Sequence, residues 1–235
     1  MSKIRIYISA KEIKENLRIE EKEVIHKIKD VLRLGKNSKI YIFDGEGKEY
    51  LYKIKEIKKN RLSLERENLI REENSPENKL ILGFPLLREG KVDFILQKCT
   101  ELGISKFYPF ICERSIRKEP NFLKLKRWQK IIKEATRQSN RLWLPHLEKV
   151  KDFKEIVRLK FSLKLVSSQN AGYLENSLKE KKEIFIIVGP EGDFSDQEYK
   201  ILKENNFIFF KLSPYILRIE TAAIFSVGLI SYLCR

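Results

Sequence analysis

Two carboxylates lie inside a glycine-rich turn in the stretch FIIVGPEGDFSDQEYKIL, residues 185–202. Glu191 and Asp193 would repel an anionic phosphate, and no lysine stands in the GKS or GKT position of a phosphate-binding loop. The turn therefore favours a nucleoside that is neutral or cationic on this side. A tight turn in front of a well-capped helix, with no ligand, remains an open alternative at this point.

A buried strand and a capped helix are expected on either side of this turn. Residues 184–188 are a continuous run of β-branched and aromatic side chains, typical of a strand buried on both faces. Ser195 stands three residues before Glu198, which is the spacing of a capping box, so a helix is predicted over 196–205. Many nucleotide sites have this order of strand, glycine turn and helix N-terminus.

The rest of the chain after residue 74 alternates between strand and helix patterns. Strands are predicted at 80–84, 105–111, 161–166 and 207–212, with helices at 89–102, 123–140 and 219–233. Such alternation predicts an α/β fold with a parallel sheet covered on both faces, and ligands at the carboxyl ends of its strands.

The first part of the chain has a different pattern. Period-2 alternation at 5–9, 39–43, 50–57 and 61–65 predicts antiparallel strands, DGEG at 44–47 predicts a hairpin turn, and one amphipathic helix is expected within 20–33. We therefore predict a small β-barrel domain over residues 1–73 and an α/β domain over 74–235, joined by the polar stretch at 71–79.

Composition points to a polyanionic partner. The chain has 48 Lys and Arg against 33 Asp and Glu, a formal net charge of +15, which makes nucleic acid the leading candidate, although an anionic membrane would also attract such a surface. No apolar run approaches a membrane span and the N-terminus has no signal-peptide pattern, so a cytoplasmic protein is expected. Isolated cysteines and two distant histidines support neither a disulfide framework nor a metal site.

A second turn, within KLSPYILRIETAAIF at 211–225, carries two adjacent apolar residues in a short loop. Ile216 and Leu217 either pack into the core or wrap a ligand, and the loop alone leaves both open.

Several motifs together give a more specific result. With VDFILQKCTELGISKFYPFICERS and RWQKIIKEATRQSNRLWLP, the motifs GPEGDF and ILRIETA resemble the small-subunit (16S) ribosomal RNA (uracil-N3)-methyltransferases of the SPOUT superfamily. HKIKDVLRL and YIFDGEG are similar to the PUA-like N-terminal domain of that family. The resemblance implies a C-terminal trefoil knot, S-adenosylmethionine as methyl donor, small-subunit ribosomal RNA or the assembled subunit as partner, and a homodimer.

The resemblance also implies three loops that hold the methyl donor. Their residues are Leu165, Val166, Gly189, Pro190, Glu191, Gly192, Leu212, Ser213, Ile216, Leu217 and Thr221. The sequence departs from the family at three positions of these loops, where glycine, glycine and often arginine are replaced by Asp193, Ser213 and Tyr215.

Methylation at N3 of uridine removes an imide proton and spreads negative charge onto the carbonyl oxygens of the base. Arg218 and Arg114 are the candidates to stabilise that charge, because a guanidinium offers a fixed fork to oxygen acceptors. Glu220 and Glu191 are candidates for the proton, although each could equally cap a helix or bind loop amides. Candidate RNA-binding residues are Lys98, Arg114, Arg137, Gln138, Arg141 and Arg33.

Two alternatives stay open on the sequence alone. One is a SPOUT methyltransferase that acts on another position of ribosomal RNA or on transfer RNA. The other is a non-catalytic RNA-binding module, for which the three departures are the best support.

Overall fold

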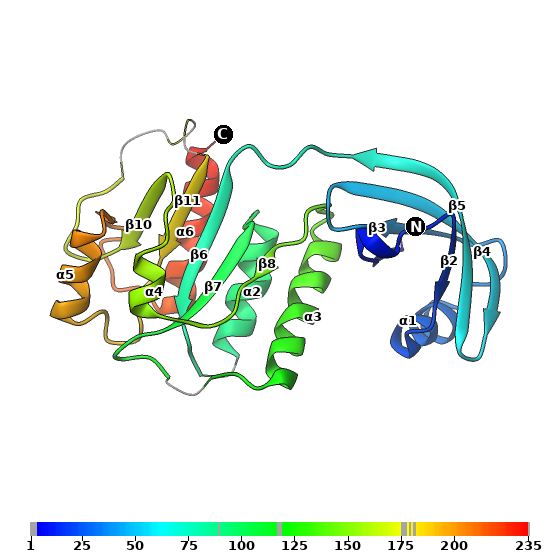
Figure 1. The fold of residues 1–235 in the computed structure, drawn as a ribbon, viewed down its shortest axis with the longest axis horizontal. Helices are drawn as coiled ribbons and strands as arrows, with labels where there is room; N and C mark the ends of the chain where they lie inside the picture. The colour runs from blue at the N-terminus through cyan, green and yellow to red at the C-terminus, as the bar shows by residue number, and fades with distance from the viewer. Residues whose placement is uncertain are drawn as a thin grey trace. The chain divides into compact units, whose positions relative to one another are not determined.

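The computed structural model describes residues 4–88, 90–116, 119–174, 178, 180 and 182–234. The chain divides into two compact units (Figure 1). Unit 1 contains residues 1–75 together with 140–144, and unit 2 contains 76–139 together with 145–235.

Unit 1 is built on a five-stranded sheet. Its strands, in spatial order, are β1 (Arg5–Tyr7), β3 (Lys39–Phe43), β4 (Lys48–Lys58), β5 (Arg61–Glu72) and β2 (Asn16–Ile19). The strands β3, β4 and β5 pair antiparallel, as predicted, and β2, which was not predicted, also pairs antiparallel to β5, but β1 pairs parallel to β3. The prediction of only antiparallel strands was therefore wrong for β1. A parallel pair requires a crossover connection, and the chain between β1 and β3 supplies it with β2 and the short helices η1 (Ala10–Glu12), α1 (Lys22–His26) and η2 (Lys27–Val31).

Alternating side chains on these strands build the core of unit 1. Ile40, Ile42, Ile54, Leu62 and Leu64 are each 2% exposed or less. The period of two puts them on one face of the sheet, as the sequence pattern predicts. Two helical side chains, Ile25 of α1 and Ile28 of η2, join the same cluster.

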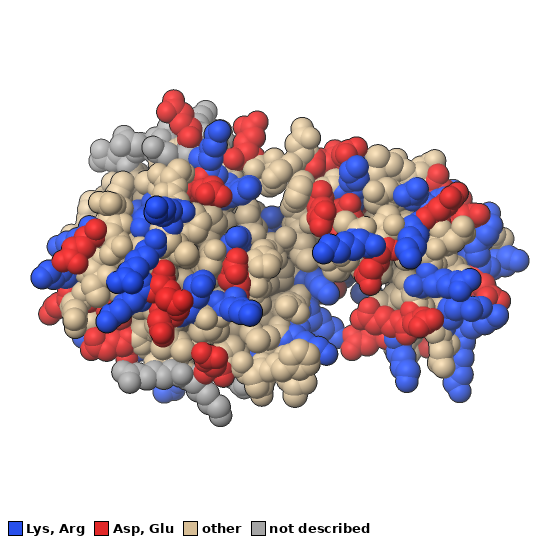
Figure 2. Space-filling view, viewed as in Figure 1, with Lys and Arg blue, Asp and Glu red and all other residues tan. Residues whose placement is uncertain are grey.

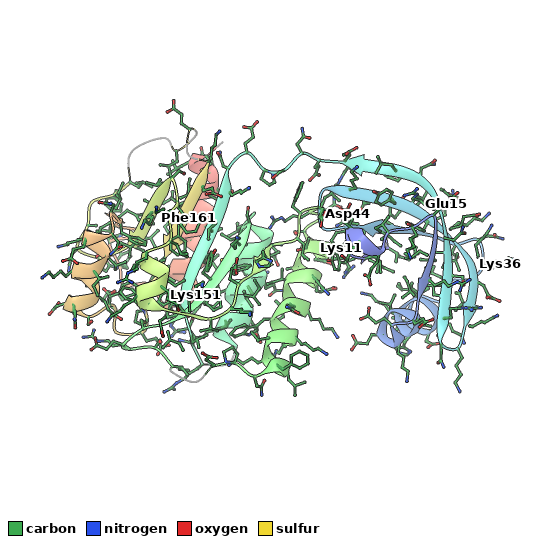
Figure 3. The ribbon with its side chains drawn as sticks, in the orientation of Figure 1. Lys11, Glu15, Lys36, Asp44, Lys151 and Phe161 are labelled. Atoms are coloured by element: carbon green, nitrogen blue, oxygen red, sulfur yellow. The ribbon has the colours of Figure 1, made fainter. Side chains whose placement is uncertain are left out.

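The predicted hairpin turn at 44–47 is confirmed. Asp44 (labelled in Figure 3) accepts hydrogen bonds from the amides of Glu46 at 2.7 Å and Lys48 at 2.9 Å through one carboxylate oxygen. Gly45 and Gly47 have φ of 79° and 106°, a backbone conformation that glycine adopts at no steric cost. The turn then leads directly into β4.

Unit 2 contains a seven-stranded sheet in which every pairing is parallel. Its strands are β6 (Lys79–Pro85), β7 (Lys106–Ile111), β8 (His146–Leu147), β9 (Lys151–Asp152), β10 (Leu163–Ser167), β11 (Glu183–Ile187) and β12 (Ile208–Phe210). The spatial order is β12-β10-β11-β6-β7-β8, with β9 also paired to β7. The predicted α/β fold with a parallel sheet is therefore confirmed.

Helices cover both faces of this sheet. They are α2 (Lys91–Glu101), α3 (Phe122–Gln138), α4 (Phe153–Val157), α5 (Asp196–Glu204) and α6 (Ile219–Leu233). The helix α2 packs on both α3 and α6, and α6 also contacts β6 and β11 (Figure 1). Phe153 of α4 and Leu202 of α5 share a second core cluster with Phe185 and Ile187 of β11. The sheet is thus enclosed between two helical layers.

Two capping boxes fix helix starts in unit 2. The predicted box is confirmed, because Ser195 Oγ accepts from the Glu198 amide at 3.4 Å and the Glu198 carboxylate accepts from the Ser195 amide at 3.0 Å. The same device, with Asp152 and Glu155, starts α4. The sequence carried that second signal in DFKE, but the helix is only one turn long and was not predicted.

Candidate functional site

Three chain segments meet at one end of the parallel sheet and line a cavity of about 650 Å³. They are residues 167–169 at the end of β10, residues 188–193 after β11, and residues 212–222, which include the start of α6. The cavity lies where a parallel α/β sheet is expected to bind a ligand. Its volume falls within the about 300–1,000 Å³ typical of small-molecule sites.

Most of the residues predicted for the methyl donor line this cavity. Of the predicted set, the lining contains Gly189, Pro190, Glu191, Gly192, Leu212, Ile216 and Leu217. Ser213 and Thr221 are not among the described residues that line it, and Leu165 and Val166 are completely buried within β10. The strand ends one residue later than predicted, so Ser167, Ser168 and Gln169 reach the cavity instead.

The turn after β11 has an unusual backbone. Gly192 and Asp193 follow one another with φ of 85° and 64°, both in the left-handed region. Glycine is the ordinary residue there, and aspartate is one of the few side chains that tolerates it. The aspartate that replaces the family's glycine at position 193 is therefore compatible with the left-handed backbone of this turn.

The Asp193 carboxylate is held in place by two donors. One oxygen accepts from the Phe194 amide at 2.9 Å and the other accepts from the Tyr199 hydroxyl of α5 at 2.6 Å. Burial, followed by the hydrogen bond to Asp193, raises the pKa of Tyr199 to about 12, against a smaller opposing effect of Ser168. The phenol therefore stays protonated and donates to Asp193 throughout the physiological pH range.

Arg114 binds the backbone of the same turn. Its guanidinium donates to the Gly192 carbonyl and, at 3.5 Å, to the Asp193 carbonyl. The preceding amide, of Glu113, donates to the Glu198 carboxylate at 2.9 Å, which ties the end of β7 to the N-terminus of α5. In this arrangement Arg114 contacts backbone carbonyls of the turn, and it is not among the described lining residues.

A lysine that sequence reasoning missed connects two of the predicted acidic residues. Lys91 lines the cavity, pairs with the Glu191 carboxylate, and has its Nζ 3.7 Å from Glu220 Oε2. The Lys91 hydrogen bond lowers the pKa of Glu191 and raises that of Lys91. The sequence did contain one signal for this pairing. Lys91 is the first residue of α2, where a positive charge is unfavourable next to the helix dipole unless an anionic partner is present.

The predicted carboxylate Glu220 has unused acceptor capacity. Its Oε2 is buried and accepts no hydrogen bond from the part of the chain that the structure describes. Arg218, two residues earlier, is the N-cap of α6, lines the cavity and is exposed. Arg218 and Glu220 therefore sit on one helix start beside the cavity, with Lys91 between Glu220 and the glycine turn.

The loop before α6 presents apolar side chains outward. Ile216 is 90% exposed and Tyr215 is 76% exposed, so core packing of Ile216 is excluded. Gln169 donates from Nε2 to the Tyr215 carbonyl at 2.6 Å and fastens this loop to the end of β10. An exposed isoleucine at the rim of a cavity provides an apolar wall for a ligand.

The predicted RNA-binding residues are distributed over both units of the chain. Lys98 and Arg137 are each paired with a carboxylate on their own helix, Glu101 and Glu134, and Gln138 is exposed at the end of α3. Arg33 and Arg141 belong to unit 1. Arg33 is exposed, whereas burial lowers the pKa of the half-buried Arg141 to about 10.

Positive and negative side chains are interspersed on the face shown in Figure 2. Among the described residues, no helix is long and apolar enough to cross a membrane. Likewise, no group of three or more His, Cys, Asp or Glu in that part of the chain could hold a metal ion.

Two protein families match this chain. The RNA methyltransferase domain family matches residues 73–231, and the RNA methyltransferase PUA domain family matches residues 19–65. The chain belongs to the RNA methyltransferase family, with a PUA domain in its N-terminal part.

Two relatives that cover most of the chain carry the same name. Ribosomal RNA small subunit methyltransferase E of Rickettsia conorii is 32% identical over 95% of this chain and 93% of its own length. The protein of the same name from Bacillus subtilis is 30% identical over 89% of this chain and 88% of its own.

Two solved structures share the fold over almost their full length. Ribosomal RNA small subunit methyltransferase E of Neisseria gonorrhoeae, bound to S-adenosylmethionine, has a TM-score of 0.89 at 28% identity and covers 99% of this chain and 98% of its own. A protein from Legionella pneumophila described as a putative methyltransferase, also in complex with S-adenosylmethionine, has a TM-score of 0.90 at 26% identity over 99% of this chain and 98% of its own.

Proposed function

We propose that this protein transfers a methyl group from S-adenosylmethionine to N3 of a uridine in small-subunit ribosomal RNA. The relatives named above act, by their names, on that RNA, and two similar structures hold that donor. The observation that carries the proposal is the 650 Å³ cavity formed by three loops at the carboxyl end of the sheet. Its size suits one nucleoside with an amino-acid tail.

The residues present fit this donor. Gly189 lines the cavity, and a Cβ added there would lie 2.7 Å from Asp193 Oδ1, so this point of the lining has no space for a side chain. Glu191 and Asp193 line the cavity together with the two cations Lys91 and Arg218, so the charges of the lining balance, which suits a ligand without phosphates. When bound, S-adenosylmethionine supplies a methyl group on a cationic sulfur, which becomes a neutral thioether after transfer.

Arg218 and Glu220 receive separate roles in this proposal. Arg218 stabilises the charge that spreads onto the uracil carbonyl oxygens as N3 loses its proton. Glu220, whose Oε2 has unused acceptor capacity, takes that proton, and Lys91 stabilises the carboxylate before the transfer. Arg114 keeps the glycine turn in shape through its bonds to the Gly192 and Asp193 carbonyls.

Arrangements implied by the family resemblance complete the proposal. Residues 1–73 form a barrel-like RNA-binding domain, and residues 74–235 form the methyltransferase domain with its C-terminal segment knotted through the cofactor loops. The three register shifts between β4 and β5 support a curled sheet in unit 1. RNA binding by unit 1 positions the substrate through phosphates, with Arg33 as an exposed contact. Because its substrate is ribosomal, the protein works in the cytoplasm.

A homodimer is part of the same proposal. Phe225 and Tyr232 of α6 are 45% and 71% exposed, and Phe94 of the neighbouring α2 is 46% exposed. Large apolar side chains that share one helical face are expected to be covered by a partner. Sedimentation equilibrium of the wild type and of Phe225→Glu would test this contact.

The decisive experiment combines donor binding and product analysis. Calorimetric titration should give binding of S-adenosylmethionine and none of ATP, and mass spectrometry of ribonuclease digests should find 3-methyluridine in small ribosomal subunits after incubation. Arg218→Ala should reduce turnover at saturating donor by about 100-fold or more, the loss seen for removed oxyanion donors, with the donor Kd nearly unchanged. Methylation of another nucleotide would favour the alternative substrate, and failure to bind the donor would favour the binding module.

A further inference from the structure

We propose that a second, smaller cavity in unit 2 binds the nucleotide next to the methylated uridine, with the base stacked on the guanidinium of Arg127. This inference rests on the proposed function and adds a substrate subsite to it. The cavity has a volume of about 240 Å³ and lies between the N-terminal ends of α2 and α3, which pack side by side (Figure 1).

The position of this cavity follows from two consecutive residues. Gly90 lines the second cavity and Lys91 lines the cofactor cavity, so the two sites share the start of α2. Consecutive Cα atoms are about 3.8 Å apart. An RNA strand that presents a uridine to the cofactor cavity therefore passes its neighbouring nucleotide close to the second one.

The volume selects the kind of group that fits. It is several times the about 30 Å³ share of one water molecule, and it is below the about 300–1,000 Å³ of sites for whole small-molecule ligands. A single base is the nucleic-acid part of suitable size. Val92 and Trp128, which are 2% and 1% exposed, give the cavity an apolar floor.

One charged pair on the cavity wall provides a flat platform. Arg127 donates to Asp93 Oδ2 at 2.5 Å, and the side chains of Arg127 and Asp93 are 65% and 19% exposed. The mostly buried carboxylate holds one nitrogen of the guanidinium, while most of the arginine surface remains open. Unpaired RNA bases stack on such planes.

Neighbouring residues of α3 complete the subsite. Lys124, whose Nζ lies 5.7 Å from the centroid of the Trp128 ring, brings a second positive charge for a phosphate, and Leu123 is 73% exposed at the edge. Asp93 is the one carboxylate among the described lining residues, and it is already bound to Arg127. The wall therefore has a net positive charge next to an apolar edge, the combination that single-stranded nucleic acid requires.

The test uses four proteins and small ribosomal subunits that lack the methyl group. The wild type is compared with Arg127→Ala, Arg127→Lys and the matched control Lys126→Ala. The control removes the same charge from the preceding residue of α3, which is not among the described residues that line the cavity. The readouts are KM and kcat for subunits, co-sedimentation with subunits, and calorimetric Kd for S-adenosylmethionine.

We expect Arg127→Ala to raise KM and the co-sedimentation Kd about 5- to 150-fold, the range for loss of one base stack. Arg127→Lys should lose nearly as much, because lysine keeps the charge but has no plane. Lys126→Ala should change both values less than twofold, and the Kd for the donor should be the same in all four proteins.

Two results would overturn the subsite. In the first, Arg127→Ala has the same KM and Kd as Lys126→Ala. In the second, Arg127→Lys has the wild-type KM, which would mean that the charge of Arg127 matters and its flat guanidinium does not. Failure of the proposed function has a different signature, since the wild type itself would then transfer no methyl group to subunits.

Discussion

A methyl group added at Gly189 should damage the cofactor cavity in a way that a second substitution repairs. The Cβ of Gly189→Ala would lie 2.7 Å from Asp193 Oδ1 and 3.3 Å from Phe194 Cδ2. The backbone at Gly189 is outside the left-handed region, so the conflict is steric alone. Asp193 cannot simply rotate away, because two hydrogen bonds hold its carboxylate.

The magnitude follows from these contacts. Overpacking in a well-packed region costs about 1–3 kcal/mol, and 1 kcal/mol lowers the Tm of a chain of this size by about 2–4 °C. Gly189→Ala should therefore lower Tm by several degrees. Because both residues line the cavity, the Kd for S-adenosylmethionine should rise at least tenfold.

The repair variant is Gly189→Ala with Asp193→Gly, which removes the opposing carboxylate and tolerates the φ of 64°. Calorimetry and thermal denaturation of the wild type, both single variants and the double variant give a complete cycle. We expect the double variant to bind more tightly than Gly189→Ala. Equal affinities for these two proteins would refute the clash with Asp193 as the cause.

Two further predictions concern polar groups around the same turn. The folded-state pKa of Tyr199, about 12, lies above its unfolded value of about 10; the stability it contributes is therefore present below pH ~10 and is lost as the pH rises through the folded pKa. Denaturation midpoints of Tyr199→Phe should lack that part of the alkaline decline, and identical pH profiles of variant and wild type would count against the buried phenol. Lys91→Met leaves Glu191 and Glu220 without their shared cation. Removal of this positive charge should favour binding of the cationic donor over the neutral product S-adenosylhomocysteine by about 1 kcal/mol of Coulomb energy, which is about fivefold in the ratio of their Kd values. Glu191→Gln removes a negative charge and should change the same ratio in the opposite direction. Calorimetric Kd ratios that equal the wild-type ratio would contradict this electrostatic role.

The parallel sheet of unit 2 could be predicted because its strands are continuous apolar runs between clear helix signals. Ser195 and Glu198 gave the start of α5 correctly, since a capping box is a local device with a fixed spacing. The strands β8 and β9 contain two residues each and carry no periodic pattern. Their existence depends on pairing with β7, which only the folded chain supplies.

The candidate site was predictable only where one segment supplied the whole signal. GPEGD contains its own turn chemistry, so the glycines and Glu191 were placed correctly on the cavity wall. Lys91 was missed because it reaches Glu191 from a helix 100 positions earlier in the chain. Leu165 and Val166 were predicted to contact the donor but are buried in β10. A shift of one or two residues along this strand exchanges a buried side chain for one that lines the cavity.

The return of residues 140–144 to unit 1 has a consequence for synthesis of the chain. Arg5 donates to the Arg141 carbonyl at 3.0 Å, Leu142 is completely buried, and a Cβ at Gly47 would lie 2.8 Å from the Trp143 ring. A ribosome that has released only the first 75 residues has therefore not yet delivered part of the unit they belong to. Unit 1 can finish folding only after α3 has left the exit tunnel. A fragment cut at residue 75 should expose apolar surface that the intact protein covers.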